Sequence, residues 1–294
     1  MMKLFIDASS TLIDSQGAIE KGAINHIPCK DWSHGRWLNW SWPALVILLF
    51  SVILQLHNAL LFLFLNLNHW AAELHIDPFW SCLTMLGDTN VILLIMTPLV
   101  LWRPSCFAAV LASAPSAGII GSALLKKLFH SPRPGSLLDS NQFHIIGRLL
   151  SEQSFPSGHS ITVFAIIAAI LASSVPQRNT LGYRSLAILL LCCASLAAFS
   201  RIAVGAHWPI DTIAGASIGW LAGLNGAWLS SRYNLTHYIT RYQLPLLIGL
   251  ALLGIWLVLR LPDDPNSMFT SWFAAISAWL VLIMTRINYY RKLN

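Results

Sequence analysis

The sequence has few charged residues. Of its 294 residues only 10% are Asp, Glu, Lys or Arg, whereas 56% are hydrophobic. Soluble domains carry about 25% charged residues, so this composition excludes an ordinary water-soluble protein and favours a chain surrounded by lipid. The net charge of +6 forms no basic patch, because the Lys and Arg residues are scattered between apolar segments. A nucleic-acid-binding protein is therefore not indicated, and topology signals explain the basic residues better.

Cysteine is also scarce, and its spacing has no pattern. The five cysteines show neither the spacing of a metal site nor that of a disulfide framework, and most lie within apolar segments. We also expect no cleavable signal peptide, since the first apolar run begins only near Pro43. Secreted disulfide-rich and zinc-binding proteins are thus not favoured.

Long apolar segments, by contrast, are abundant. A membrane-spanning helix needs about 20 mostly apolar residues. Eight segments approach this requirement, and the sequence therefore predicts an all-α integral membrane protein with spans at 43–66, 80–101, 104–125, 158–176, 185–203, 209–230, 244–261 and 269–286. Residues 1–42 are expected to form a cytoplasmic leader, whose last part is rich in tryptophan and is typical of a membrane interface.

The second of these spans contains an acidic residue, Asp88, within "LGDTN". Two interpretations are open. The span can start near Asp88, with the carboxylate as its N-cap, or the carboxylate can be buried for a functional purpose. We keep Asp88 as a secondary site candidate.

An even number of spans places both termini on one side of the membrane. The loops on that side hold most of the 18 Lys and Arg residues. The positive-inside rule then predicts cytoplasmic termini in a cell or inner membrane. The loop 126–156 is expected to face the periplasm or exterior.

Three stretches with ionisable residues lie at membrane boundaries on this outward side. They are "KKLFHSPRPG" with Lys126 and Arg133, "SFPSGHS" with Ser157, Gly158 and His159, and "SRIAVGAHWPID" with Arg201, His207 and Asp211. Each stretch alone also fits a structural role, such as a helix start, a snorkelling lysine or a satisfied His–Asp pair. Their combination on one side favours a function.

The residue types fit phosphoryl transfer. A phosphate dianion needs fixed positive charge, which Lys126, Arg133 and Arg201 can supply. Ser157 and Gly158 open a helix whose first N–H groups can cradle an anion. No group of carboxylates accompanies these residues, so a two-metal mechanism is not indicated and no cofactor is expected.

The two histidines fit complementary roles. Asp211 follows His207 by four residues, so a helix that starts near Pro209 lets the carboxylate reach the imidazole, fix its tautomer and free the other nitrogen to attack phosphorus. His159 can then protonate the leaving alkoxide. Glycines at 215, 219 and 223 form a stripe that predicts close helix packing.

The three stretches resemble the signature motifs of the type 2 phosphatidic acid phosphatase superfamily, which membrane lipid phosphatases share with vanadium haloperoxidases. Lysine, six residues and Arg-Pro match Lys126 to Pro134. Pro-Ser-Gly-His matches 156–159, and Ser-Arg, five residues, His, three residues and Asp match 200–211.

The resemblance implies a six-helix core over 43–230 and a metal-independent lipid phosphatase. It implies His207 as the phosphohistidine-forming nucleophile, Asp211 as its orienting partner and His159 as general acid. The remaining motif residues would bind the phosphate: Lys126, Arg133, Ser157, Gly158 and Arg201. Residues 231–294 depart from a minimal member of the family by adding two spans and a basic tail.

Several functions remain open at this point. The substrate of a phosphatase could be undecaprenyl diphosphate, phosphatidylglycerol phosphate, phosphatidate or the 1-phosphate of lipid A. A lipid-to-lipid phosphotransferase differs only in the acceptor. A non-enzymatic lipid carrier is disfavoured, because binding alone needs only the cations and not a paired histidine. The expected partners are the substrate and membrane lipids, with no nucleic acid, and the sequence leaves the oligomeric state open.

Overall fold

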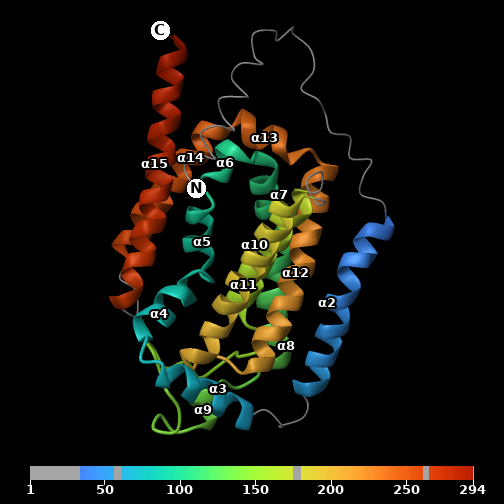
Figure 1. Ribbon diagram of the computed structural model, residues 1–294, viewed down its shortest axis with the longest axis vertical. Coiled ribbons are helices and arrows are strands. Elements are labelled where there is room, and N and C mark those ends of the chain that lie inside the picture. Colours follow the sequence, from blue (N-terminus) through green and yellow to red (C-terminus); the bar gives the residue numbers. More distant parts are fainter. Residues whose placement is uncertain (1–33, 56–60, 175–179, 261–264, 294) are drawn as a thin grey trace. The chain divides into compact units, whose positions relative to one another are not determined.

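All regular elements that the structure describes are helical (Figure 1). The structure is a computed structural model that describes residues 34–55, 61–174, 180–260 and 265–293. Its helices are α2 (His34–Gln55), α3 (Leu61–Glu73), α4 (Asp77–Met85), α5 (Thr89–Ile95), α6 (Leu99–Trp102), α7 (Pro104–Pro115), η3 (Ser116–Leu124), α8 (Leu125–Phe129), α9 (Pro134–Leu137), α10 (Gly158–Ser173), α11 (Leu181–Ala203), α12 (Pro209–Arg232), α13 (Leu235–Arg241), α14 (Gln243–Leu259), η5 (Pro265–Ser267) and α15 (Met268–Leu293).

The helices confirm an all-α, multi-pass integral membrane protein. Within the described residues three segments are long and apolar enough to cross a membrane: Pro104–Leu137, Leu181–Ala203 and Pro265–Ile287. Two helix pairs, α4 with α5 and α13 with α14, also pass this test together but are each bent by 80°. Shorter apolar helices cover Trp40–Ile53 and Gly158–Ser173. Helices thus occupy all eight expected segments, while the number that cross the membrane stays a prediction.

The first expected span has different bounds in the structure. Helix α2 begins at His34 rather than near Pro43 and ends at Gln55, and α3 is a separate helix. The last tryptophans of the expected leader therefore belong to α2. Trp40 stacks on Trp220 of α12 with ring centroids 6.2 Å apart, and its carbonyl accepts from the Trp220 indole N–H at 2.9 Å. This packing places Trp40, which precedes the apolar run, against α12. Residues 1–33 lie outside the described residues.

Glycines on α12 bring its backbone against that of α10, as the sequence predicts. A Cβ added at Gly219 or Gly223 would lie 2.3 Å from a carbonyl oxygen of α10, and one at Gly215 would lie 2.6 Å from the Ser157 carbonyl. The two helices run side by side (Figure 1). The Ser157 N–H donates to the Asp211 carbonyl at 3.0 Å, so the first turns of both helices lie next to each other.

Helix α5 connects the core to the C-terminal helices. Asp88 caps it by accepting from the N–H groups of Asn90 and Val91 at 2.9 and 3.1 Å. The N-cap interpretation of Asp88 is therefore confirmed. Buried side chains of α5, including Val91 and Leu94, pack in one cluster with apolar residues of α14 and α15. Helix α5, which begins after the break from α4, thus packs against the two added C-terminal helices.

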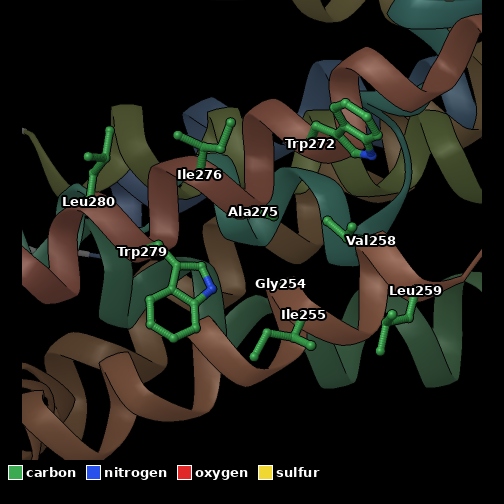
Figure 2. A pocket seen from close by; sticks show the side chains of 9 residues that line it. All are labelled: Gly254, Ile255, Val258, Leu259, Trp272, Ala275, Ile276, Trp279 and Leu280. Atoms are coloured by element: carbon green, nitrogen blue, oxygen red, sulfur yellow. The ribbon is translucent and has the colours of Figure 1, made fainter.

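Helices α14 and α15 leave an apolar groove between them (Figure 2). The groove encloses about 520 Å³. Trp272 and Trp279 line it and are 53% and 39% exposed. Exposed tryptophans on apolar helices are typical of a surface that faces lipid.

Candidate active site

His207 lies at the junction of α11 and α12, where two of the predicted motif residues contact it. The side chain is buried, with 1% exposure. Its Nδ1 lies 3.4 Å from Asp211 Oδ2, and its Nε2 lies 3.3 Å from Arg133 Nη1. The tautomer that donates from Nδ1 to the carboxylate leaves Nε2 with a lone pair. The Asp211 carboxylate thus contacts one ring nitrogen, and the Arg133 guanidinium contacts the other.

Asp211 is fully buried in the first turn of α12. Helix α12 begins at Pro209, as expected, because proline suits the first turn of a helix. Asp211 Oδ2 accepts from the Trp208 N–H at 2.9 Å and from the Ser154 hydroxyl. Its Oδ1 has no partner among the described residues. The carboxylate is therefore oriented on one oxygen by three neighbours.

Arg133 is held by backbone carbonyls, although it lies in a loop. Its Nε donates to the Glu152 carbonyl at 2.6 Å and its Nη1 to the Ala206 carbonyl at 3.0 Å. The side chain is only 8% exposed. These bonds fix the planar guanidinium beside His207 before any ligand arrives, which is the arrangement that electrostatic preorganisation requires.

Arg201 and Lys126 supply the other two cations of the motifs. Arg201, 7% exposed, donates from Nη1 to the Thr84 hydroxyl, while its Nε has no partner among the described residues. Lys126 lies near the start of α10: a Cβ added at Gly158 would be 3.8 Å from its Nζ. The ammonium group of Lys126 thus lies close to the N-terminus of α10.

The start of α10 carries the remaining two motif residues. Ser157 is its N-cap and is fully buried. His159 follows in the first turn and packs against the α4–α5 break, where a Cβ added at Gly87 would lie 2.5 Å from the His159 Cβ. His159 thus packs against a residue of the α4–α5 break, which the sequence motifs do not include.

The environment of His207 favours its neutral form. Burial lowers the pKa of His207 well below its usual range, and the positive charges of Arg133 and Arg201 lower it further. A neutral imidazole is the form that can attack an electrophile. The same cations attract an anion. Among the described residues, no three His, Cys, Asp or Glu side chains lie close enough together to hold a metal ion.

A cavity of about 300 Å³ adjoins these residues. His159 and Arg201 line it together with Thr84 and Asp88 from the α4–α5 break. Asp88 is therefore a wall residue of this cavity as well as a helix cap, while a catalytic or binding role for it stays a prediction.

Three polar residues that hold the site are absent from the sequence motifs. Ser154 donates to Asp211, and Thr84 accepts from Arg201. Asn68 of α3, fully buried, donates to the carbonyls of His144, Ile202 and Ala203 at 3.0 to 3.1 Å and accepts from the His144 N–H at 2.7 Å. Ser154 directly precedes the Phe-Pro-Ser-Gly-His stretch, but no residue spacing distinguishes any of the three from an ordinary polar residue.

Comparisons with known proteins agree with the motifs. The family model described as the PAP2 superfamily matches residues 105–239. The chain is 37% identical over 98 residues to a lipid A 1-phosphatase from Rhizobium etli. This match covers 33% of this chain and 38% of that protein. It is 38% identical over 81 residues to phosphatidylglycerophosphatase B from Escherichia coli, covering 27% of this chain and 30% of that protein. The matched parts thus span about a third of these relatives.

Among solved structures, LpxE from Aquifex aeolicus superposes with a TM-score of 0.48 at 27% identity, over 57% of this chain and 93% of that one. The matched family region contains all three motif stretches, 126–134, 156–159 and 200–211. The family match and the motifs within it support a member of the PAP2 superfamily.

Proposed function

We propose that the protein is a lipid phosphate phosphatase that removes a terminal phosphate from a membrane lipid through a phosphohistidine. The observation that carries the proposal is the environment of His207, whose Nδ1 faces the Asp211 carboxylate while its Nε2 faces the Arg133 guanidinium. A binding site alone would not need a carboxylate to orient a buried, neutral imidazole. The similarity to proteins named as lipid phosphatases supports the same class of reaction.

The first step transfers the phosphoryl group to the protein. The Nε2 lone pair of His207 attacks phosphorus, an N–P bond forms, and the P–O bond to the lipid breaks. The electron pair of that bond goes to the leaving oxygen, which takes a proton from His159, whose protonated form the bound phosphate dianion stabilises. The Asp211 carboxylate stabilises the imidazolium character that develops on His207, as the acid of a triad does.

The second step releases phosphate. Neutral His159 now removes a proton from water, and the water oxygen attacks phosphorus as the N–P bond breaks. His207 regains its lone pair and His159 its proton, so the site returns to its starting state. In both steps the cations Lys126, Arg133 and Arg201 hold the non-bridging oxygens, and the first N–H groups of α10 add donors.

Substitution of the His–Asp pair tests the proposal. His207→Ala should abolish phosphate release from lipid phosphates, and Asp211→Asn should leave a small residual activity, because the amide can still hold the ring but cannot stabilise its positive charge. His237→Ala is a matched control, since His237 is exposed on α13. Acid-quenched wild-type protein incubated with ³²P-labelled lipid should carry acid-labile label that His207→Ala lacks.

Two results would contradict the proposal. Normal turnover by folded His207→Ala protein would show that His207 is not the nucleophile. Label that moves from the lipid to a second lipid, with none released as inorganic phosphate, would identify a phosphotransferase instead.

The proposed reaction takes place on the outward side of the membrane, in the cytoplasmic membrane of the cell, with the termini in the cytoplasm. Support comes from the excess of basic residues in the loops on the side of the termini. Ser140, exposed in the loop after α9, offers a test. In a protein without its native cysteines, Ser140→Cys should react with an impermeant maleimide added to intact cells, whereas Tyr233→Cys after α12 should react only after lysis. The reverse pattern would place the site in the cytoplasm.

A further inference from the structure

The cavity next to His159 has two arginines on its wall that belong to none of the three motifs. Arg148 lies in the loop between α9 and α10, and Arg260 follows the last residue of α14. Both line the same cavity of about 300 Å³ as His159 and Arg201. Segments more than a hundred residues apart in the sequence thus bring positive charge to one space beside the proposed reaction centre.

Each arginine is presented by its local structure. Gly147 has a φ of 79°, a conformation that favours glycine, and it turns the loop just before Arg148. The Arg260 guanidinium lies 5.5 Å from the ring centroid of Trp256 on α14. An arginine over an aromatic ring is held in place while the edge of its guanidinium keeps its N–H donors for an oxyanion.

The wall has an excess of positive charge. Its arginines are Arg148, Arg201 and Arg260, and its one carboxylate is Asp88. The Asp88 Oδ1 is already engaged by two N–H groups at the start of α5. Arg201 is one of the motif cations proposed to hold the terminal phosphate, which leaves Arg148 and Arg260 as positive charge that this phosphate does not need. Such a surplus suits a second anionic group.

The cavity lies where the leaving group must be. His159 donates its proton to the leaving oxygen in the proposed mechanism, and His159 lines this cavity, whereas the attacking nitrogen of His207 does not. A group attached to the leaving oxygen would therefore enter this cavity beside His159.

We propose that Arg148 and Arg260 form a subsite for a second phosphate carried by the leaving group. The preferred substrates are then lipids whose product keeps a phosphate, as a prenyl diphosphate or phosphatidylglycerol phosphate does, and not phosphatidate, whose product is uncharged. This inference rests on the proposed phosphatase function and narrows its substrate class.

The test compares substrates whose leaving group does or does not carry a phosphate. The purified full-length protein is assayed for phosphate release with farnesyl diphosphate and farnesyl monophosphate, and in a second pair with phosphatidylglycerol phosphate and phosphatidate of the same acyl chains. Wild-type kcat/KM should be higher for the member of each pair whose leaving group carries a phosphate. The two pairs also distinguish a diphosphate from a phosphodiester as the second anion.

Arginine substitutions then assign the preference to residues. R148Q and R260Q should each lower kcat/KM for the doubly phosphorylated substrate by roughly fivefold, since exposed charge pairs contribute little individually, and should leave the monophosphate values unchanged. R241Q is a matched control, because Arg241 also lies over an aromatic ring, with its guanidinium 5.9 Å from the Tyr242 centroid, but does not line the cavity.

The outcomes separate the inference from the proposed function. Equal wild-type kcat/KM for both members of each pair, or equal losses on both in R148Q and R260Q, would overturn the subsite while the phosphatase function stands. An unchanged preference in R260Q also overturns the subsite. No phosphate release from any of the lipids would overturn the proposed function, and the subsite with it.

Discussion

Replacing Ser154 by alanine tests whether the Asp211 carboxylate must be held in order to work. Ser154 is fully buried, and its hydroxyl donates to Asp211 Oδ2 and lies 3.5 Å from His207 Nδ1. The substitution removes one oxygen and leaves the backbone bond from the Ser154 N–H to the Ser131 carbonyl, at 2.8 Å, in place. The loop is therefore expected to keep its path.

The size of the effect follows from the bonds that remain. Without Ser154, Asp211 Oδ2 keeps the Trp208 N–H at 2.9 Å and the long contact to His207 at 3.4 Å, while Oδ1 has no partner among the described residues. A hydrogen bond to a charged group contributes about 1.5–3 kcal/mol. If that energy is used to orient His207, turnover should fall roughly ten- to hundredfold, because about 1.4 kcal/mol corresponds to one decade in rate.

The assay separates positioning from binding. Single-turnover formation of the phosphoenzyme and steady-state kcat should both fall in Ser154→Ala, while KM changes little, because Ser154 does not contact the cations proposed to bind phosphate. Ser217→Ala is the control: Ser217 is a buried serine on the same helix as Asp211, bonded to the Ile213 carbonyl at 3.1 Å. Wild-type kcat in Ser154→Ala, or the same loss in Ser217→Ala, would refute this positioning role.

Three further predictions concern the histidines and their neighbours. His159→Ala should slow turnover more for a lipid alkoxide than for p-nitrophenol as leaving group, and equal losses would exclude a general acid. Gly87→Ala should lower activity at least about tenfold, because its Cβ would lie 2.5 Å from the His159 Cβ, whereas Gly182→Ala, with open space around it, should not. Since burial lowers the pKa of His207, the acid limb of kcat/KM should lie below about pH 6.5, and a limb above that value would contradict a neutral nucleophile.

The sequence predicts the His207–Asp211 pair because local geometry is enough for it. A spacing of four residues with Pro209 between them specifies both a helix start and a side-chain reach of one turn. The same holds for the glycine stripe of α12, whose period of four identifies one helix face. Both features depend on residues close together in the chain, so no knowledge of the remaining fold is needed.

Residues that act across the fold could not be predicted in this way. Thr84 meets Arg201, and Asn68 meets Ala203, only because α3 and α4 pack on α11. A helix start at Asp88 is one of the two interpretations that the sequence leaves open, but the 80° bend between α4 and α5 does not follow from the apolar pattern of 80–101. Hydropathy records which residues avoid water, but a Gly-Asp pair in an apolar run fits both a straight helix and a break.

The break between α4 and α5 connects the two added helices, α14 and α15, to the candidate active site. Helices α14 and α15 pack on α5, and α5 begins at the break whose Gly87 lies against His159. The C-terminal helices therefore reach the site on the side of the leaving group, whereas the oriented imidazole of His207 is held by α12 and by the loops next to α9 and α10. Changes in α14 and α15 can therefore alter which lipid is accepted without displacing His207 and Asp211.

Variants in α14 and α15 should change the ratio of kcat/KM between lipids. Phosphoenzyme formation from p-nitrophenyl phosphate, whose leaving group is small, should stay the same. A loss of both in proportion would mean that the helices support the whole core and have no separate effect on the leaving group.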